Sequence, residues 1–274
     1  EPNYRWTWDE FEELGVQFVT AANPPGTRER SYFVQAVSPI QLRRSLGLSY
    51  FNETMTGCTL DDPRNAEVLR RIYRWTRELR LIPTVAERGA MSAEGSRAGD
   101  AMFYLFAHGR FAMLALPRWA FIMLRVQGEL PMRVVEPFHG GFPNIEFGTG
   151  MLAVYSGTKH PQEALRFLQF LTSEPFNLLV ASSGDSLPPV PRYVHTDEFM
   201  RPPDHPGEWE MQKVFATAAP EIGITMVRSL FVITGVFRRI DGQMIQAVLA
   251  DRLTPEEAGR FAAEQINAAI QQKI

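Results

Sequence analysis

Apolar residues recur every three or four positions in several stretches of the chain, and this spacing predicts amphipathic helices. Some of these stretches begin with strong helix signals. Thr7 and Glu10 have the spacing of a capping box. Pro63 follows Asp62 as a first helical residue follows its N-cap, and Thr254 begins a similar pattern near the end. The predicted helices span residues 7–20, 32–46, 63–79, 101–108, 164–171 and 255–269.

Shorter runs of apolar residues predict strands at 112–116, 132–136 and 151–155. The polar, glycine-containing stretch 84–99 predicts a loop, and the prolines between 186 and 206 exclude a long helix there. Helices therefore dominate, with short strands between them. This order predicts an α/β layered fold rather than a β-sandwich or a pure helical bundle.

The charge balance is 28 Lys and Arg against 31 Asp and Glu, a net charge of −3, which gives no basic surface for nucleic acid. No apolar run approaches the roughly 20 residues that span a bilayer. The single cysteine, Cys58, has no basic neighbour nearby in the sequence, so we predict a buried, unreactive thiol. The chain begins at Glu1 with neither a methionine nor a leader pattern, and we expect it to start inside a longer protein.

Catalytic motifs are missing from the sequence. The histidines lack the spacing of a helical metal site, and there is no nucleophile elbow, Walker loop or dinucleotide fingerprint. Two carboxylate pairs leave glycoside hydrolysis open as an alternative. Glu208 and Glu210 flank a tryptophan and are predicted to lie on a solvated face. Glu136 and Glu146 straddle a glycine-rich loop, and nothing in the pattern sets them across one bond.

Aromatic and arginine residues gather instead at breaks between elements, where side chains can line a binding cleft. Trp119 follows Pro117 and Arg118 at a predicted strand end, so we expect its ring to be displayed as a plane on which a sugar can stack. The guanidinium group of Arg118 suits hydroxyl or carboxylate groups of a ligand. Core packing is predicted for several other aromatic residues: Phe103, Phe138, Phe237, Trp6 and Trp75.

Five stretches resemble, in order, the motifs of the family 1 extracellular solute-binding proteins of ABC transporters, the group that contains maltose-binding protein. The third stretch has the pattern F-x-x-G-x-x-A-M followed by Trp119, a position where the family often stacks a tryptophan on a sugar ring. The fourth is similar to the family's hinge-crossing strand and the helix after it. The five stretches are residues 4–11 (YRWTWDEF), 58–63 (CTLDDP), 106–119, 148–164 and 254–267.

The resemblance implies an α/β, helix-rich fold of the type II periplasmic-binding-protein kind, with two interleaved lobes. The first lobe would be incomplete, because the family's opening portion would precede Glu1. We expect residues 1–152 to form the first part of the C-terminal lobe and residues 153–212 to be an inserted segment of the N-terminal lobe. Residues 213–274 would then be the terminal helices of the C-terminal lobe, and a hinge is expected near 148–153.

The resemblance also implies a protein outside the cytoplasm, periplasmic or membrane-anchored, that binds a carbohydrate or related small solute by hinge closure. It would deliver that solute to the permease subunits of an ABC importer, and ligand contacts are expected at Trp119, Arg118, Phe142, Glu146 and Arg238. No metal, organic cofactor or nucleic acid is expected. A membrane would be met only through the permease or a lipid anchor outside this chain. Besides the hydrolase, a helical protein-binding domain without a small ligand stays open.

Overall fold

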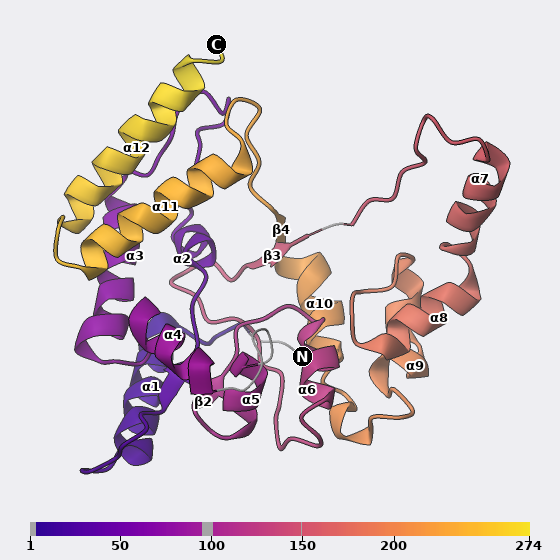
Figure 1. Ribbon diagram of the computed structural model, residues 1–274, viewed down its shortest axis with the longest axis horizontal. Helices are drawn as coiled ribbons and strands as arrows, with labels where there is room; N and C mark the ends of the chain where they lie inside the picture. The colour runs from indigo at the N-terminus through magenta and orange to yellow at the C-terminus, as the bar shows by residue number, and fades with distance from the viewer. Residues whose placement is uncertain (1–3, 95–100, 149) are drawn as a thin grey trace. The chain divides into compact units, whose positions relative to one another are not determined.

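The computed structural model describes residues 4–94, 101–148 and 150–274, which form two compact units (Figure 1). Unit 2 comprises residues 4–115, 137–146 and 224–274, and unit 1 contains the described residues of 116–136 and 147–223. The predicted inserted segment, 153–212, lies within unit 1. The assignment of each segment to a lobe of a solute-binding protein stays a prediction.

Unit 2 is built from helices around a short parallel strand pair. Strand β1 pairs with β2, with Tyr32 beside Phe111 and Val34 beside Met113. Its elements are α1 (Trp8–Ala22), β1 (Tyr32–Val34), α2 (Pro39–Ser45), α3 (Pro63–Tyr73), a π-helical turn (Arg74–Glu78), α4 (Val85–Glu94), α5 (Ala101–Ala107), β2 (Phe111–Met113), α11 (Thr234–Leu249) and α12 (Pro255–Gln271).

Unit 1 is made of short helices joined by turns. These are α6 (Ala120–Arg125), α7 (Pro161–Phe170), α8 (Glu174–Ser183), a 3₁₀ turn (Pro191–His195), α9 (Asp197–Met200), a second 3₁₀ turn (Pro206–Glu208) and α10 (Lys213–Ile222). Strands β3 (Ile145–Phe147) and β4 (Gly223–Thr225) pair with each other, and in each of them the chain passes from one unit to the other.

The predicted helix starts are confirmed at all three strong signals. In α1, Thr7 Oγ1 accepts a hydrogen bond from Glu10 N (3.3 Å) and Glu10 Oε2 accepts one from Thr7 N (2.7 Å). Thr254 and Glu257 make the same reciprocal pair at the start of α12, and Asp62 caps α3. Each cap satisfies backbone N–H groups that a helix start otherwise leaves without partners.

Other sequence predictions of local structure are wrong. The predicted helix 32–46 exists only as α2, because the buried residues of β1 pair with a strand far along the chain. Residues 85–94 of the predicted loop form α4, which Thr84 and Glu87 cap; residues 95–100 lie outside the described part. Of the predicted strand 112–116, only residues 112 and 113 belong to β2. Segments 132–136 and 151–155 pair with no described strand.

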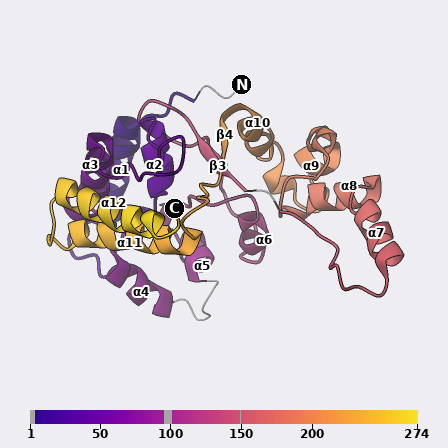
Figure 2. The same ribbon diagram turned by 90° about the horizontal axis from the view of Figure 1, so that it is seen from above.

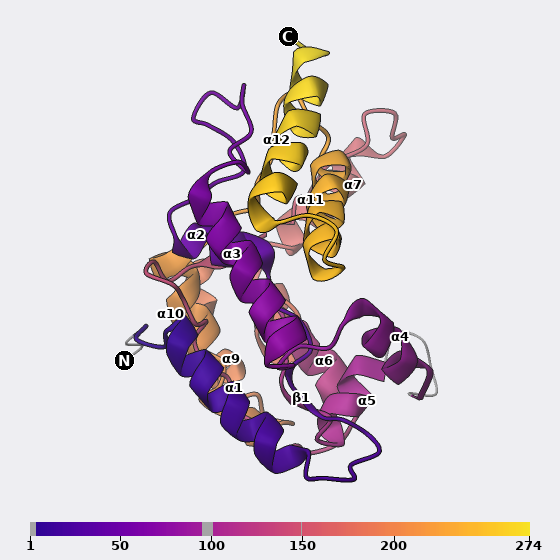
Figure 3. The same ribbon diagram turned by 90° about the vertical axis from the view of Figure 1, so that its left-hand side faces the viewer.

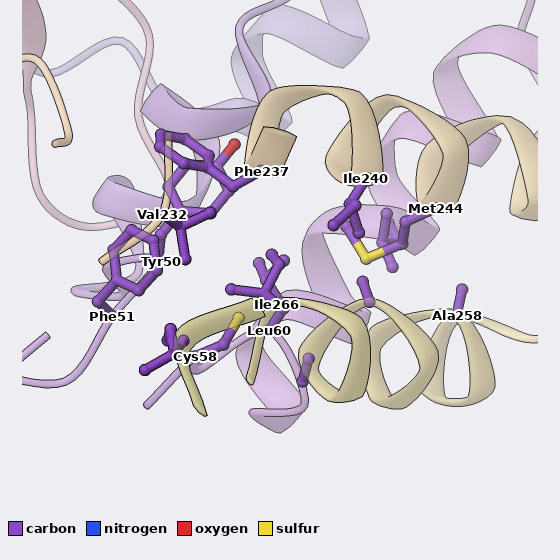
Figure 4. Packing of buried hydrophobic residues seen from close by; sticks show 14 of the residues in the cluster. Tyr50, Phe51, Cys58, Leu60, Val232, Phe237, Ile240, Met244, Ala258 and Ile266 are labelled. Carbon is purple, nitrogen blue, oxygen red and sulfur yellow. The ribbon is translucent and has the colours of Figure 1, made fainter. Parts of the chain in front are cut away.

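One core of unit 2 lies where α11 and α12 run side by side, as Figure 2 and Figure 3 show. Ile240 and Met244 of α11 face Ile266 of α12, with Leu60 between the helices (Figure 4). Phe237 closes one end of this cluster, against Tyr50 and Phe51. Burial of these large apolar side chains, each a few kcal/mol at about 25 cal/mol per Å², fixes the two helices.

A second core of unit 2 joins α1 to α3 through aromatic rings. Trp75, in the π-helical turn, is fully buried against Trp8 and Phe11, and its Nε1 donates to Glu12 Oε2 (3.0 Å). The predicted core positions Trp75, Phe103 and Phe237 are confirmed, since each is at most 2% exposed. Phe138 and Trp6 are partly buried beside the same cluster.

The prediction that Cys58 is buried is also confirmed, and its lack of reactivity stays a prediction. The side chain is buried, and desolvation raises the pKa of its thiol to about 11. No helix among the residues that the structure describes combines the length and the apolar character needed to cross a membrane.

Candidate functional site

Phe142 is the most exposed of the predicted ligand-binding residues, at 64%. The backbone holds it in place, because Phe142 N donates to Ser45 O (2.9 Å) at the end of α2. Gly141, with φ +153°, lets the chain approach this close: a Cβ there would lie 3.2 Å from Ser45 O. A large, exposed ring on a fixed backbone can stack on an apolar ligand face.

Glu146 of β3 and Arg238 of α11 come together in unit 2. Glu146 Oε1 lies 3.9 Å from Arg238 Nη2, which is an ion pair without a hydrogen bond. The Arg238 side chain is half exposed and the Glu146 side chain is 27% exposed. The pair therefore offers both a donor and an acceptor to a ligand hydroxyl group, and its use in binding stays a prediction.

A surface pocket of about 340 Å³ lies on the segment that connects β4 to α11. The helical turn that contains Arg238 follows directly after Thr234, the last residue of its lining. The sequence gives little signal of this pocket, because most of its wall is a loop marked only by a run of apolar residues. Its lining residues are Met226, Val227, Arg228, Ser229, Val232, Ile233 and Thr234.

Trp119 lies in unit 1, at the start of α6, and is 41% exposed. The expectation of a displayed ring agrees with this exposure. Backbone hydrogen bonds fix the turn: Ala120 N donates to Pro117 O (3.1 Å) and Ile122 N donates to Trp119 O (3.1 Å). The ring is thus carried on an ordered helix start, and stacking on a sugar stays a prediction.

Arg118, whose guanidinium group was expected to contact a ligand, is buried. It is only 4% exposed, and its guanidinium donates to Gln212 Oε1 (2.8 Å), to Ala181 O (2.7 Å) and to Ser186 O. Burial, and then the positive charge of Arg125, lower its pKa to about 10. In this structure Arg118 fastens α6 to the C-terminal end of α8, so it positions the helix that carries Trp119.

The prediction that Glu208 lies on a solvated face is wrong. Glu208 is buried and accepts two hydrogen bonds from Arg125, at 2.7 Å and 2.8 Å, while Gln212 Nε2 donates to the same carboxylate (3.1 Å). Glu210 is exposed and pairs with Arg201 (3.0 Å). Both carboxylates of the proposed hydrolytic pair are therefore held by arginines.

The contacts of Arg125 with Glu208, and of Glu208 with Gln212, were not predictable from the sequence. Arg125, Glu208 and Gln212 connect α6 to the turn before α10, and no local pattern reveals contacts between residues more than 80 positions apart. Among the described residues, no group of three or more His, Cys, Asp or Glu side chains could hold a metal ion.

Residues 2–176 match the model of the bacterial extracellular solute-binding protein family, so the chain belongs to this family. This is a family of binding proteins rather than enzymes, and its extracellular description implies a location outside the cytoplasm. No curated protein sequence matches the chain.

Several solved structures share the fold at low sequence identity. The ABC substrate-binding protein Lmo0181 from Listeria monocytogenes, in complex with cycloalternan, gives a TM-score of 0.70 at 18% identity over 99% of this chain. The maltose/maltodextrin-binding domain MalE from Bdellovibrio bacteriovorus, bound to maltotriose, gives 0.69 at 18% over 99%. A Thermotoga lettingae solute-binding protein bound with alpha-D-tagatose gives 0.70 at 16% over 98%.

The fold is thus that of the type II periplasmic-binding-protein-like sugar binders, as the resemblance implied. The chain spans 65% of the first of these structures, 66% of the second and 65% of the third. The expected incompleteness of the first lobe is consistent with this coverage.

Proposed function

We propose that the protein binds a carbohydrate or a related small solute and serves as the extracytoplasmic binding component of an ABC importer. The observation that carries the proposal is the half-exposed Trp119 ring on a helix that Arg118 and Arg125 lock in place. A fixed aromatic plane suits the apolar face of a sugar ring, because little conformational entropy is lost on binding. Membership of the solute-binding family and the sugars bound in the similar structures support it.

Binding would close two lobes on the solute and present the closed form to the permease. The paired strands β3 and β4 are the places where such a hinge would bend, since the chain passes from one unit to the other within each. Closure requires that the ligand touch both lobes, because a ligand shifts an equilibrium only by its differential affinity for the two states. Phe142, Glu146 and Arg238 of unit 2 would supply contacts besides Trp119, and Arg118 would act by supporting Trp119. The protein would be either free in the periplasm or attached to the membrane by a lipid anchor outside this chain.

Tryptophan fluorescence during titration with a sugar panel tests this function. We expect saturable quenching by at least one sugar, and Trp119→Ala should weaken binding about tenfold or more, as truncation of a central tryptophan does. The matched control is Trp209→Ala, because Trp209 is also half exposed in unit 1 and its Nε1 donates to Pro202 O (3.2 Å). Equal loss of binding in both variants would count against a stacking role for Trp119.

A further inference from the structure

Two neighbouring arginines of α2 differ in how their guanidinium groups are satisfied. Each nitrogen of the Arg43 guanidinium donates a hydrogen bond within the protein. Its Nε donates to Asn65 Oδ1 (2.8 Å), and its Nη2 donates to Asp241 Oδ1 (2.5 Å). Among the described residues, Arg44 finds one acceptor, Thr225 O, to which its Nη2 donates (2.5 Å). Its Nη1 is buried and has no hydrogen-bond partner among the described residues. A buried charged donor without an acceptor is costly, so this group calls for an anion or an acceptor from outside.

The charges around Arg44 do not balance. Burial lowers the pKa of the Arg44 guanidinium, and the negative charge of the Glu146 carboxylate opposes this shift. Glu146 also faces Arg238 at 3.9 Å, so two guanidinium groups share one carboxylate and the net charge of the three is +1. Neither arginine forms a hydrogen bond to Glu146 in the described structure.

A second unsatisfied group lies on the same stretch of chain as Glu146, and it is an acceptor, which suits a hydroxyl donor and not an anion. Asn144 is 3% exposed and its Nδ2 donates to Gln41 O (3.1 Å) and Ser45 Oγ (3.2 Å) of α2, while its Oδ1 is buried without a partner among the described residues. Asn144 directly precedes β3, the strand that contains Glu146, and its side-chain hydrogen bonds hold this stretch of chain against α2. The segment thus follows α2 past Gln41 and Ser45, and Arg44 lies beside them on the helix.

We propose that Arg44, Glu146 and Arg238 form a subsite of unit 2 that takes the anionic group, a carboxylate or a phosphate, of an acidic carbohydrate. The proposal rests on the proposed function and narrows its solute class. Forked guanidinium groups bind both kinds of anion with two parallel hydrogen bonds. Glu146 would hold Arg238 in place and accept a hydrogen bond from a neighbouring sugar hydroxyl group.

Isothermal titration calorimetry with the full chain tests the subsite with four probes: glucose, glucuronate, glucose 6-phosphate and maltotriose. We expect glucuronate or glucose 6-phosphate to bind about tenfold or more tightly than glucose, the size of a charge-assisted hydrogen-bond contribution. A preference for only one of the two acids would identify the anion. A preference that falls as salt is raised would support a charge effect.

Variants separate the subsite from general effects. Arg44→Gln should reduce the preference for the acidic sugar to a small factor, and Arg44→Lys, which keeps the charge but not the fork, should give an intermediate value. Glu146→Gln should strengthen binding of the acidic sugar, because a like charge is removed. Arg28→Gln, at an exposed loop position of unit 2, is the matched control and should change nothing.

The outcomes also separate this inference from the proposed function. Binding of glucose or maltotriose without preference for the acids would overturn the anionic subsite and leave sugar binding standing. A preference that survives in a folded Arg44→Gln variant would overturn it as well. Binding of none of the four probes would count against both.

Discussion

Arg43 and Asp241 join residues far apart in the sequence inside unit 2. Arg43 is fully buried, and Asp241 bonds both to it and to the hydroxyl group of Tyr50 (2.5 Å). Burial, the largest single influence, lowers the pKa of Arg43, but the charges of Asp241 and Tyr50 and the hydrogen bonds to both together outweigh it, so the pKa is raised. Burial also raises the pKa of Tyr50. The network holds α2 against α11.

Removing the negative charge of Asp241 should destabilise the fold strongly. Asp241→Asn would leave a buried guanidinium uncompensated, and we expect a loss of about 3–5 kcal/mol in the free energy of unfolding. Urea denaturation followed by circular dichroism measures it. The control is Glu210→Gln, because the exposed pair Arg201–Glu210 should contribute less than about 1 kcal/mol. Similar losses in both variants would contradict the role given to burial.

Cys58 should be unreactive in the folded protein. With a pKa of about 11, roughly one thiol in a thousand is ionised at pH 8, and the side chain is buried. We expect iodoacetamide to modify Cys58 much more slowly in native protein than in urea, as measured by mass spectrometry.

The pKa of Cys58 has a consequence for stability at alkaline pH. It is raised from an ordinary value of 9.0, so ionisation favours the unfolded chain. The stabilisation from the neutral thiol is complete below this ordinary value and is lost as the pH rises toward 11. Cys58→Ala should lose less stability over that interval than the wild type. An equal loss in both proteins would contradict the raised pKa.

At the scale of elements, α12 depends on a glycine where it crosses the loop before α3. A Cβ on Gly259 would lie 2.5 Å from Leu60 O and 3.2 Å from Asn65 Nδ2. The helix backbone therefore comes into close contact with the chain at Leu60, and only a residue without a side chain fits.

Two glycine-to-alanine variants should change stability in opposite directions. Gly259→Ala should destabilise by about 1–3 kcal/mol, because the new methyl group overlaps a backbone oxygen. Gly242→Ala, on the exposed side of α11 with nothing within 4 Å, should stabilise by about 0.5–1 kcal/mol through helix propensity. Thermal unfolding compares the two, and a stabilising Gly259→Ala would show that the packing at Leu60 can relax.

The sequence allowed prediction of elements whose signals are local. The caps at Thr7 and Thr254 depend on residues three positions away, so they were predictable. Strand β1 was not, because the partner that turns Tyr32–Val34 from helix to strand begins at Phe111. Helix α4 was missed because its glycine and serine content suggested a loop, although Thr84 and Glu87 formed a cap that could have been noticed.

The candidate site shows the same division. The exposure of Trp119 follows from the break at Pro117, which is local. The burial of Arg118 depends on acceptors at Ala181, Ser186 and Gln212, and a single sequence without known contacts cannot bring these together. Arg44 was missed for a similar reason, since its partner Thr225 lies on a distant strand.

At the scale of the whole molecule, unit 1 exposes several large apolar side chains on and beside one helix. Every residue of α7 is described and none is buried. Leu165, Phe167 and Phe170 of this helix are each about half exposed, and Tyr155 is 77% exposed in the extended segment before it. Surfaces of this kind bind other apolar surfaces. Within unit 1, α8 lies between α6 and α7, as Figure 1 and Figure 2 show.

A protein consisting of residues 1–274 should therefore bind the dye ANS while folded. Phe167→Gln together with Leu165→Gln should lower the dye fluorescence without a change in the circular dichroism spectrum, because both side chains are exposed. Phe261→Gln is the matched control, since Phe261 is also about half exposed but lies alone on α12 of unit 2. Dye binding that both variants reduce equally would contradict a surface concentrated on α7.

The order in which the segments of unit 2 are synthesised determines when its core can form. Its core around Leu60 and Leu69 is completed by side chains of α11 and α12, from Phe237 to Ile270. While a ribosome is still producing those helices, the earlier side chains of this one core, Leu60 and Leu69 among them, lack their packing partners. This core can therefore close only after residues 232–270 have emerged, which makes the segment around Leu60 one of the last parts of unit 2 to acquire its packing.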